Sequence, residues 1–227
     1  MPPTLLPEAR DPTLATAVHL RLREDILSGR LPPGQKLKLR DLAESYGAGA
    51  SPMREALSQL AAEGLAERLE HRGFRVAAAA PNGLDGLIRS RVLAECAALR
   101  ESIARGDAAW EEAVVLAEHR LNRLAVSLDP RRYAANPEWE ACHGAFHKAL
   151  LEGCGAPPLI AFCDRLREEA RRYRSVAKTL AYPGRDVPAE HRAIAEATLA
   201  RDADRAAAHL AAHYERTGAI VSADLGR

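Results

Sequence analysis

The chain has 227 residues, of which 47% are apolar, 28% are charged and 4% are aromatic. This composition provides enough apolar side chains for a core, and no apolar run reaches the roughly 18 residues of a membrane span. A membrane protein and a disordered chain are therefore excluded, and a globular protein remains. Lysine and arginine number 32 against 31 aspartate and glutamate residues, a net charge of +1. Any attraction to nucleic acid must come from a local cluster of positive charge.

Residues 1–12 contain several prolines and no basic stretch followed by an apolar segment. We expect a flexible arm, no secretory signal and a cytoplasmic protein.

The cysteines Cys96, Cys142, Cys154 and Cys163 form no C-x-x-C pair. We expect them to be reduced and buried as apolar residues, with a redox or ligand role as the alternative.

Three helices are predicted in the first part of the chain. A stripe of apolar residues with a spacing of four, from Leu14 to Ile26, predicts a helix over 13–28. A short second helix is expected over 39–46. Ser51 then supplies a hydroxyl N-cap and Pro52 the first helical position of a third helix, over residues 52–63.

Two short strands follow the helices, Leu65 to Leu69 and Phe74 to Ala78, joined by a tight bend at Gly73. A turn signal at Pro81-Asn82-Gly83 then separates this region from the rest of the chain. The predicted organisation is an N-terminal arm, a winged helix-turn-helix domain, a linker and a helical effector-binding and dimerisation domain, at residues 1–12, 13–79, 80–83 and 84–227.

The second domain has apolar stripes at helical spacing throughout. Breaks in the pattern are expected at Gly106-Asp107, Asp129-Pro130, Gly153 to Pro158, Pro183-Gly184 and Arg201-Asp202. About six helices without a strand, joined by short loops, predict an antiparallel bundle. The expected fold class is thus mainly α, with an N-terminal winged helix-turn-helix and a C-terminal all-α helical bundle.

The first domain resembles the DNA-binding domain of the GntR superfamily. The motifs that carry the resemblance are Gly29-Arg-Leu-Pro-Pro-Gly34, Leu42-Ala43, Pro52-Met-Arg-Glu-Ala-Leu57, Glu63-Gly-Leu65 and Arg72-Gly73. In such a domain the second helix of the pair enters the major groove of DNA.

The resemblance implies specific DNA contacts. It implies that Arg40 and Arg54 contact DNA, that Ser51 faces phosphate at the N-terminus of the recognition helix, and that the tip at Arg72 and Gly73 reaches the minor groove. A guanidinium can pair with two guanine acceptors, and the free amides at a helix N-terminus favour phosphate. Ordinary solvated surface charge is the alternative interpretation of the two arginines.

One departure from the family pattern concerns base recognition. Ala50 stands where the family usually has arginine, and Gly49 replaces the usual serine. One base contact is therefore missing, which leaves the operator sequence open.

The second domain carries two histidines four residues apart, His143 and His147, on one face of a predicted helix. At this spacing both imidazoles can reach one metal ion. His191 and His213 could complete a site from two other helices. Surface histidines or histidines with protein partners are the alternative interpretation.

Residues 84–221 resemble the FCD effector domain of the FadR subfamily, through His143 to His147, Glu190 to Ile194 and Asp202 to His213. The resemblance implies a metal held by His143, His147, His191 and His213, with His143 at a position where the family has aspartate. Four neutral imidazoles favour zinc, nickel or copper and leave the charge of the ion uncompensated. A four-histidine cluster without metal and a site that uses Cys142 remain open.

Arg91 resembles an arginine that projects towards the metal cavity in this family, and it is the expected contact of a carboxylate effector. An ion pair with Glu95, four residues later, is the alternative. Residues 171–174, Arg-Arg-Tyr-Arg, weakly resemble members that respond to dicarboxylates, and a solvated helix face explains them equally well.

The function that these resemblances imply is a cytoplasmic, homodimeric transcriptional regulator, in the first instance a repressor. Its expected partners are an imperfectly palindromic DNA operator and a small carboxylic or dicarboxylic acid, which binds near a zinc or nickel ion and controls DNA affinity. A direct metal sensor and a metalloenzyme are the alternatives. The metalloenzyme is disfavoured because no motif places a general base beside the histidines.

Overall fold

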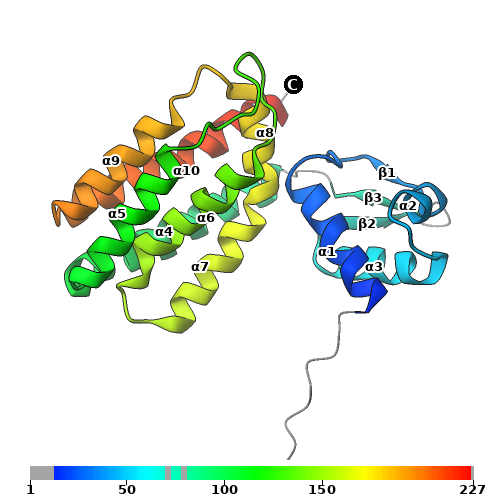
Figure 1. Ribbon diagram of the computed structural model, residues 1–227, viewed down its shortest axis with the longest axis horizontal. Coiled ribbons are helices and arrows are strands. Elements are labelled where there is room, and N and C mark those ends of the chain that lie inside the picture. Colours follow the sequence, from blue (N-terminus) through cyan, green and yellow to red (C-terminus); the bar gives the residue numbers. More distant parts are fainter. Residues whose placement is uncertain (1–12, 70–72, 78–80, 226–227) are drawn as a thin grey trace, which may run out of the picture. The chain divides into compact units, whose positions relative to one another are not determined.

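The computed structural model describes residues 13–69, 73–77 and 81–225, which form two compact units divided between residues 78 and 79 (Figure 1). The predicted arm at residues 1–12 lies outside the described residues. Each unit has its own cluster of buried apolar side chains.

The first unit combines three helices with a small antiparallel sheet. Its elements are α1 (Leu14–Leu27), β1 (Lys36–Leu37), α2 (Leu39–Ser45), α3 (Ala50–Ala62), β2 (Ala66–Leu69) and β3 (Gly73–Val76), with the strands in the order β1-β3-β2. The core between helices and sheet includes Leu22, Met53, Leu57, Leu60 and Val76, all at most 1% exposed. This arrangement confirms the winged helix-turn-helix fold.

The strand β1 is absent from the sequence prediction. It pairs Lys36 with Arg75 and Leu37 with Phe74. Two residues are too few to show an alternating pattern, so only the partner strand β3 makes this segment a strand.

The helix α3 begins two residues earlier than predicted. Gly49 occupies the N-cap position without a side-chain cap, and Ser51 is the second residue of the helix, so the predicted N-cap at Ser51 is wrong. Pro52 is tolerated as the third helical residue because an N–H group at that position has no acceptor within the helix.

The second unit is a bundle of helices (Figure 1). The seven helices of the described residues are α4 (Pro81–Arg105), α5 (Ala108–Asn122), α6 (Pro137–Glu152), α7 (Pro157–Glu169), α8 (Arg171–Ala181), α9 (Val187–Leu199) and α10 (Ala203–Leu225). α10 packs against α4, α8 and α9, while α6 packs against α4, α5 and α7. The all-α prediction for this unit is confirmed.

Two boundaries of the second unit differ from the sequence prediction. α4 begins at Pro81, so residues 81–83, assigned to a linker, form its first turn. The segment predicted as one helix between Pro158 and Pro183 is divided at Ala170, which ends α7 and precedes α8. Ala170 is 2% exposed. Tertiary packing places this break, since alanine is itself a strong helix former.

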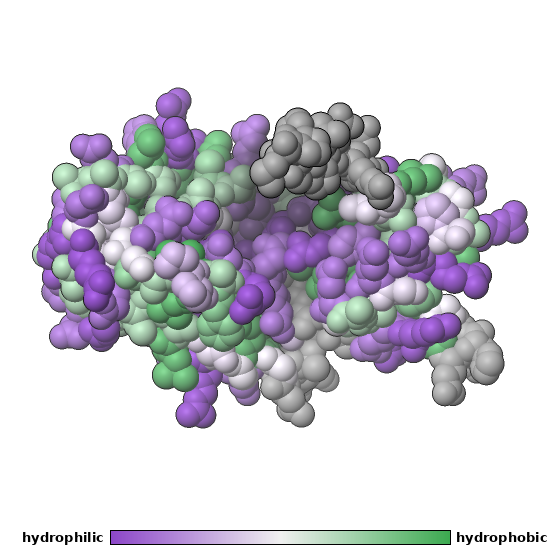
Figure 2. All heavy atoms as spheres, turned by 90° about the horizontal axis from the view of Figure 1, so that it is seen from below, coloured by the Kyte–Doolittle hydropathy of each residue, from purple (hydrophilic) through white to green (hydrophobic). Residues whose placement is uncertain are grey.

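Hydrophilic and hydrophobic residues are interspersed on the face of the molecule that Figure 2 shows. Among the described helices, none combines the length and apolar character needed to cross a membrane.

The four cysteines are free; Cys154 and Cys163 are buried, and Cys96 and Cys142 are half-buried.

Candidate functional site

The helices α2 and α3 present unpaired arginines to solvent. Arg40 on α2 and Arg54 on α3 are both exposed, and neither forms a side-chain hydrogen bond or ion pair with another described residue. Ser51 is exposed in the first turn of α3, where the helix has free amides. These three side chains are available to a phosphate or a base edge.

The wing of the first unit is formed by β2 and β3. Gly73 has a φ of +88°, a conformation that favours glycine at this bend, whereas Arg72 lies outside the described residues. Arg75 is held by Glu67, with 2.6 Å between Nη2 and Oε2. Arg68, exposed on β2, forms no ion pair with the described residues and is a further DNA-contact candidate that the sequence motifs did not single out.

The second unit brings four histidines together from three helices. α6 contributes His143 and His147, α9 contributes His191 and α10 contributes His213. All are at most 4% exposed, and one ligand atom from each lies within 4.8 Å of the others. Neither Cys142 nor His209 belongs to this group. The structure thus assembles the four residues that the sequence motifs selected.

The four histidines are neutral at pH 7. Burial is the main cause, and it acts together with repulsion from neighbouring positive charges. These effects hold the pKa values of His143, His147 and His191 well below 6.5 and lower that of His213 to about 4. Neutral imidazoles retain the lone pairs that a metal ion requires.

Several ring nitrogens of the cluster have no protein partner in the described part of the chain. They are Nδ1 of His143, Nε2 of His147 and both nitrogens of His191, all buried. Buried polar atoms are normally hydrogen-bonded, so orphaned nitrogens that converge from three helices call for a ligand. The donor set fits a borderline-soft divalent ion such as zinc or nickel.

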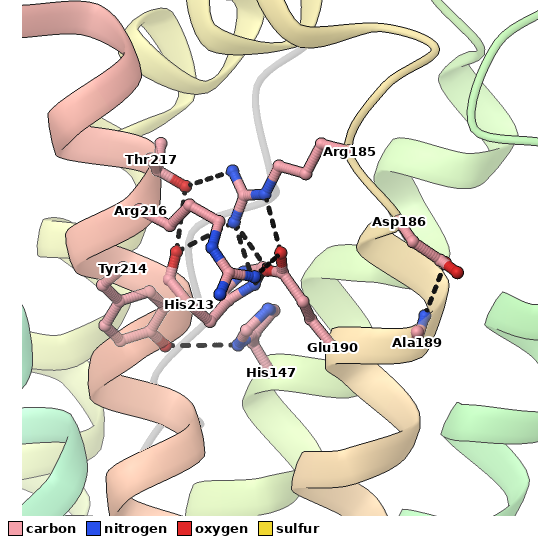
Figure 3. A network of polar contacts seen from close by, with 9 residues as sticks. All are labelled: His147, Arg185, Asp186, Ala189, Glu190, His213, Tyr214, Arg216 and Thr217. Carbon is pink, nitrogen blue, oxygen red and sulfur yellow. Dashed lines mark hydrogen bonds and ion pairs between the residues drawn. The ribbon is translucent and has the colours of Figure 1, made fainter.

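Glu190 fixes the orientation of His213 (Figure 3). Its Oε2 lies 2.7 Å from Nδ1 of His213 and 2.7 Å from Nη2 of Arg185. Although burial alone raises the pKa of Glu190, the hydrogen bonds from His213 and Arg185 lower it far below its usual value. The ionised carboxylate therefore accepts the Nδ1 proton of His213 and leaves Nε2 as the ligand atom.

Tyr214 orients His147 in a similar way. Its hydroxyl donates to Oε2 of Glu95 at 2.7 Å and lies 3.2 Å from Nδ1 of His147 (Figure 3). Burial raises the pKa of Tyr214 well above 10, so the phenol keeps its proton. Because that proton goes to Glu95, Nδ1 of His147 must carry a hydrogen and donate, which leaves Nε2 free for a metal.

Arg91 is held in a buried ion pair. Its Nε lies 2.6 Å from Oε1 of Glu95, and its guanidinium carbon lies 3.7 Å from the centre of the Tyr214 ring. The ion pair with Glu95, one of the two sequence interpretations, is therefore present. Arg91 does not line the cavity beside the histidine cluster.

A cavity of about 50 Å³ lies beside the histidine cluster. Its lining includes two of the four histidines and three cationic side chains, and most of the remaining lining residues are apolar. The lining residues are Val126, Trp139, His143, Arg174, Ala177, Lys178, Ala181, Tyr182, Arg185, Val187, His213 and Thr217. The sequence motifs missed Trp139, Lys178 and Arg185. Trp139 stacks on His143 one helical turn away, a spacing visible in the sequence, but Arg185 follows the turn at Pro183-Gly184 and carries no periodic signal.

We expect the substitution Glu190→Gln to weaken metal binding by about 10- to 100-fold, the usual effect of removing the partner of a metal-bound histidine. The amide loses the charge that holds the Nδ1 proton of His213. Competition against a chelating dye measures the affinity. Glu196→Gln, on the exposed face of the same helix, is the matched control and is expected to bind metal like the wild type. Equal affinities of the two variants would contradict this role.

Comparison with known proteins identifies both units. Residues 14–76 match the bacterial regulatory proteins of the gntR family, and residues 87–216 match the FCD domain. The chain belongs to the GntR family. It is a DNA-binding transcriptional regulator, and the relatives are regulators too, which confirms that it is not an enzyme.

Two similar GntR regulators cover most of the chain. The HTH-type transcriptional regulator BphR of Paraburkholderia xenovorans (strain LB400) is 36% identical over 95% of this chain and 88% of its own length. The HTH-type transcriptional repressor GlaR of Escherichia coli (strain K12) is 34% identical over 85% of this chain and 88% of its own length.

Solved structures of GntR regulators share the fold. The GntR structure from Rhodococcus sp. RHA1 has a TM-score of 0.72 at 22% identity and covers 93% of this chain and 97% of its own. E. coli McbR/YncC has a TM-score of 0.70 at 19% identity and covers 94% of this chain and 99% of its own.

Proposed function

We propose that this GntR regulator is a homodimeric repressor of the FadR subfamily, whose operator affinity is controlled by a small carboxylic or dicarboxylic acid bound near a metal ion. The observation that carries the proposal is the cluster of four buried, neutral histidines beside a cavity lined by cationic groups. Two of the relatives are described as repressors, which supports the direction of regulation.

The metal ion, zinc or nickel, would be held by His143, His147, His191 and His213. When bound, the ion would supply a positive charge that attracts a carboxylate. In the first unit, Arg40, Ser51, Arg54, Arg72 and Gly73 are the proposed DNA contacts. Because the operator is chromosomal DNA, we place the protein in the cytoplasm.

The geometry of DNA supports the proposed homodimer. A single recognition helix reads one half-site, whereas two copies related by a twofold axis read an imperfect palindrome. An acid bound in the second units can change DNA affinity only by as much as it prefers one arrangement of the dimer over another.

The test is a fluorescence-anisotropy titration of the protein against its own upstream DNA, with the metal content measured in parallel. We expect specific binding that one member of a panel of small carboxylic acids releases. DNA binding that is indifferent to every acid but lost on removal of the metal would instead point to a direct metal sensor or to a purely structural ion. That alternative rests on the same histidine cluster. A protein that binds neither metal nor acid would contradict both readings.

A further inference from the structure

Glu55 lies at the centre of the exposed face of α3. The buried face of this helix is formed by Met53, Ala56, Leu57 and Leu60. Glu55 is two residues from Met53 and two residues from Leu57, and two residues turn an α-helix by about 200°. Its side chain therefore leaves the helix on the side opposite the core, one turn after Ser51.

The carboxylate of Glu55 has no polar partner in the described part of the chain. Glu55 is exposed, and its side chain forms neither a hydrogen bond nor an ion pair with a described residue. By contrast, the carboxylates of Glu63 and Glu67 are held by Arg23 and Arg75. The negative charge of Glu55 is thus free to act on a molecule that approaches α3.

DNA places two demands on a free carboxylate at this position. The phosphates on both sides of the major groove repel its negative charge. A charge that loses its water must also be hydrogen-bonded, because an unpaired charge is costly to desolvate. If α3 enters the groove, the carboxylate of Glu55 therefore needs a hydrogen-bond donor on the edge of a base.

The chemistry of the major groove selects cytosine as that base. A carboxylate only accepts hydrogen bonds, and the donors on base edges in this groove are the N4 amino group of cytosine and the N6 amino group of adenine. The amino group of adenine lies beside the acceptor N7, whereas that of cytosine lies beside a C–H group. Guanine and thymine present acceptors without a donor. Cytosine alone offers a donor without an adjacent acceptor.

We propose that Glu55 is a specificity-determining residue of this regulator and that its carboxylate accepts a hydrogen bond from N4 of a cytosine in each operator half-site. The inference rests on the proposed role of α3 as the recognition helix, and it names a base that this helix selects. Glu55 also disfavours other sequences, because without the cytosine its charge stays unpaired between the phosphates. It thus raises specificity and lowers the affinity for DNA in general.

The test compares base preferences of the full-length protein and its variants. The operator is the sequence that the wild type enriches from a library of random DNA, and each base pair of one half-site is then changed in turn. Fluorescence anisotropy at fixed salt should reveal one position at which replacing cytosine weakens binding by the wild type about 5- to 100-fold. Glu55→Ala should bind all four bases at that position within about threefold. It should also bind DNA of scrambled sequence more tightly than the wild type does, because a negative charge has been removed.

Two further probes separate the carboxylate from other causes. Glu55→Gln replaces the carboxylate by an amide, which pairs with N6 and N7 of adenine. The preferred base at this position should therefore change from cytosine to adenine. An operator with N4-methylcytosine carries a methyl group in place of the amino hydrogen that faces the groove and keeps the paired guanine. The methyl group should weaken binding by the wild type but not by Glu55→Ala.

Glu44→Gln is the matched control. Glu44 is exposed on α2 without a polar side-chain partner among the described residues, so this substitution removes the same charge from the same unit. We expect it to keep the base preferences of the wild type, and all three variants to melt at the wild-type temperature. Unchanged base preferences of both Glu55 variants, a uniform loss of affinity for every sequence, or the same effects from Glu44→Gln would overturn the proposal.

Arg54→Ala separates this inference from the proposed function. If Arg54→Ala changes the base preferences but neither Glu55 variant does, α3 stands as the recognition helix and the role of Glu55 fails. If none of the three variants changes a base preference, the proposed role of α3 fails as well.

Discussion

Replacing Arg54 by alanine is expected to weaken operator binding by roughly 30-fold to 10⁴-fold. A bidentate arginine contact to a base contributes about 1–3 kcal/mol of binding free energy, and the proposed dimer would lose two such contacts. Arg54 is exposed on α3, and its side chain forms no hydrogen bond or ion pair with the described residues, so its removal breaks no such contact with them. We therefore expect the loss to fall on DNA binding and the variant to keep the fold and the assembly state of the wild type.

Fluorescence anisotropy at fixed salt measures this loss, since phosphate contacts make the affinity depend on ionic strength. The matched control is Arg123→Ala, which removes an exposed arginine from the second unit and changes the net charge equally. We expect the control to bind the operator like the wild type. Light scattering and thermal melting test whether both variants keep the fold and the assembly state of the wild type. Wild-type affinity of Arg54→Ala would refute α3 as the recognition helix.

The double substitution of His147 and His191 by alanine is expected to abolish metal binding and to lower the melting temperature in the presence of metal by roughly 8–16 °C. A ligand present at about 1,000 times its dissociation constant stabilises the folded state by about 4 kcal/mol. In a domain of this size each kcal/mol corresponds to about 2–4 °C. Both histidines are 1% exposed and carry ring nitrogens that have no partner among the described residues. We therefore expect the loss of the bound ion to be the main effect of the double substitution.

The informative comparison is with chelator-treated wild type. If the histidines serve mainly to hold the ion, the double variant and the metal-free wild type should melt at similar temperatures. Added zinc should then raise the melting temperature of the wild type but not that of the double variant. His209→Ala is the control, because His209 lies one helical turn from His213 but outside the cluster. Mass spectrometry of the metal content should give wild-type occupancy for His209→Ala. Unchanged occupancy in the double variant would reject this ligand set.

Much of the fold was predictable because its signals are local. The apolar stripe on α1, the glycine that begins β3 and the loop residues between helices each act within a few residues of the chain. The features that the sequence analysis did not predict have a non-local cause. β1 exists only because β3 pairs with it, and the division at Ala170 comes from packing in the bundle rather than from a helix-breaking residue.

The sequence by itself determined the family, the two-unit organisation and the four histidines, because motifs and the spacing of His143 and His147 are properties of the chain alone. Only the tertiary structure decided which charges in the second unit are neutralised. Arg91 and Arg174 both lie on helices and are equally charged in the sequence, yet one is paired with Glu95 and the other lines the cavity. Pairing and desolvation depend on side chains brought together from distant helices, and no local pattern encodes them.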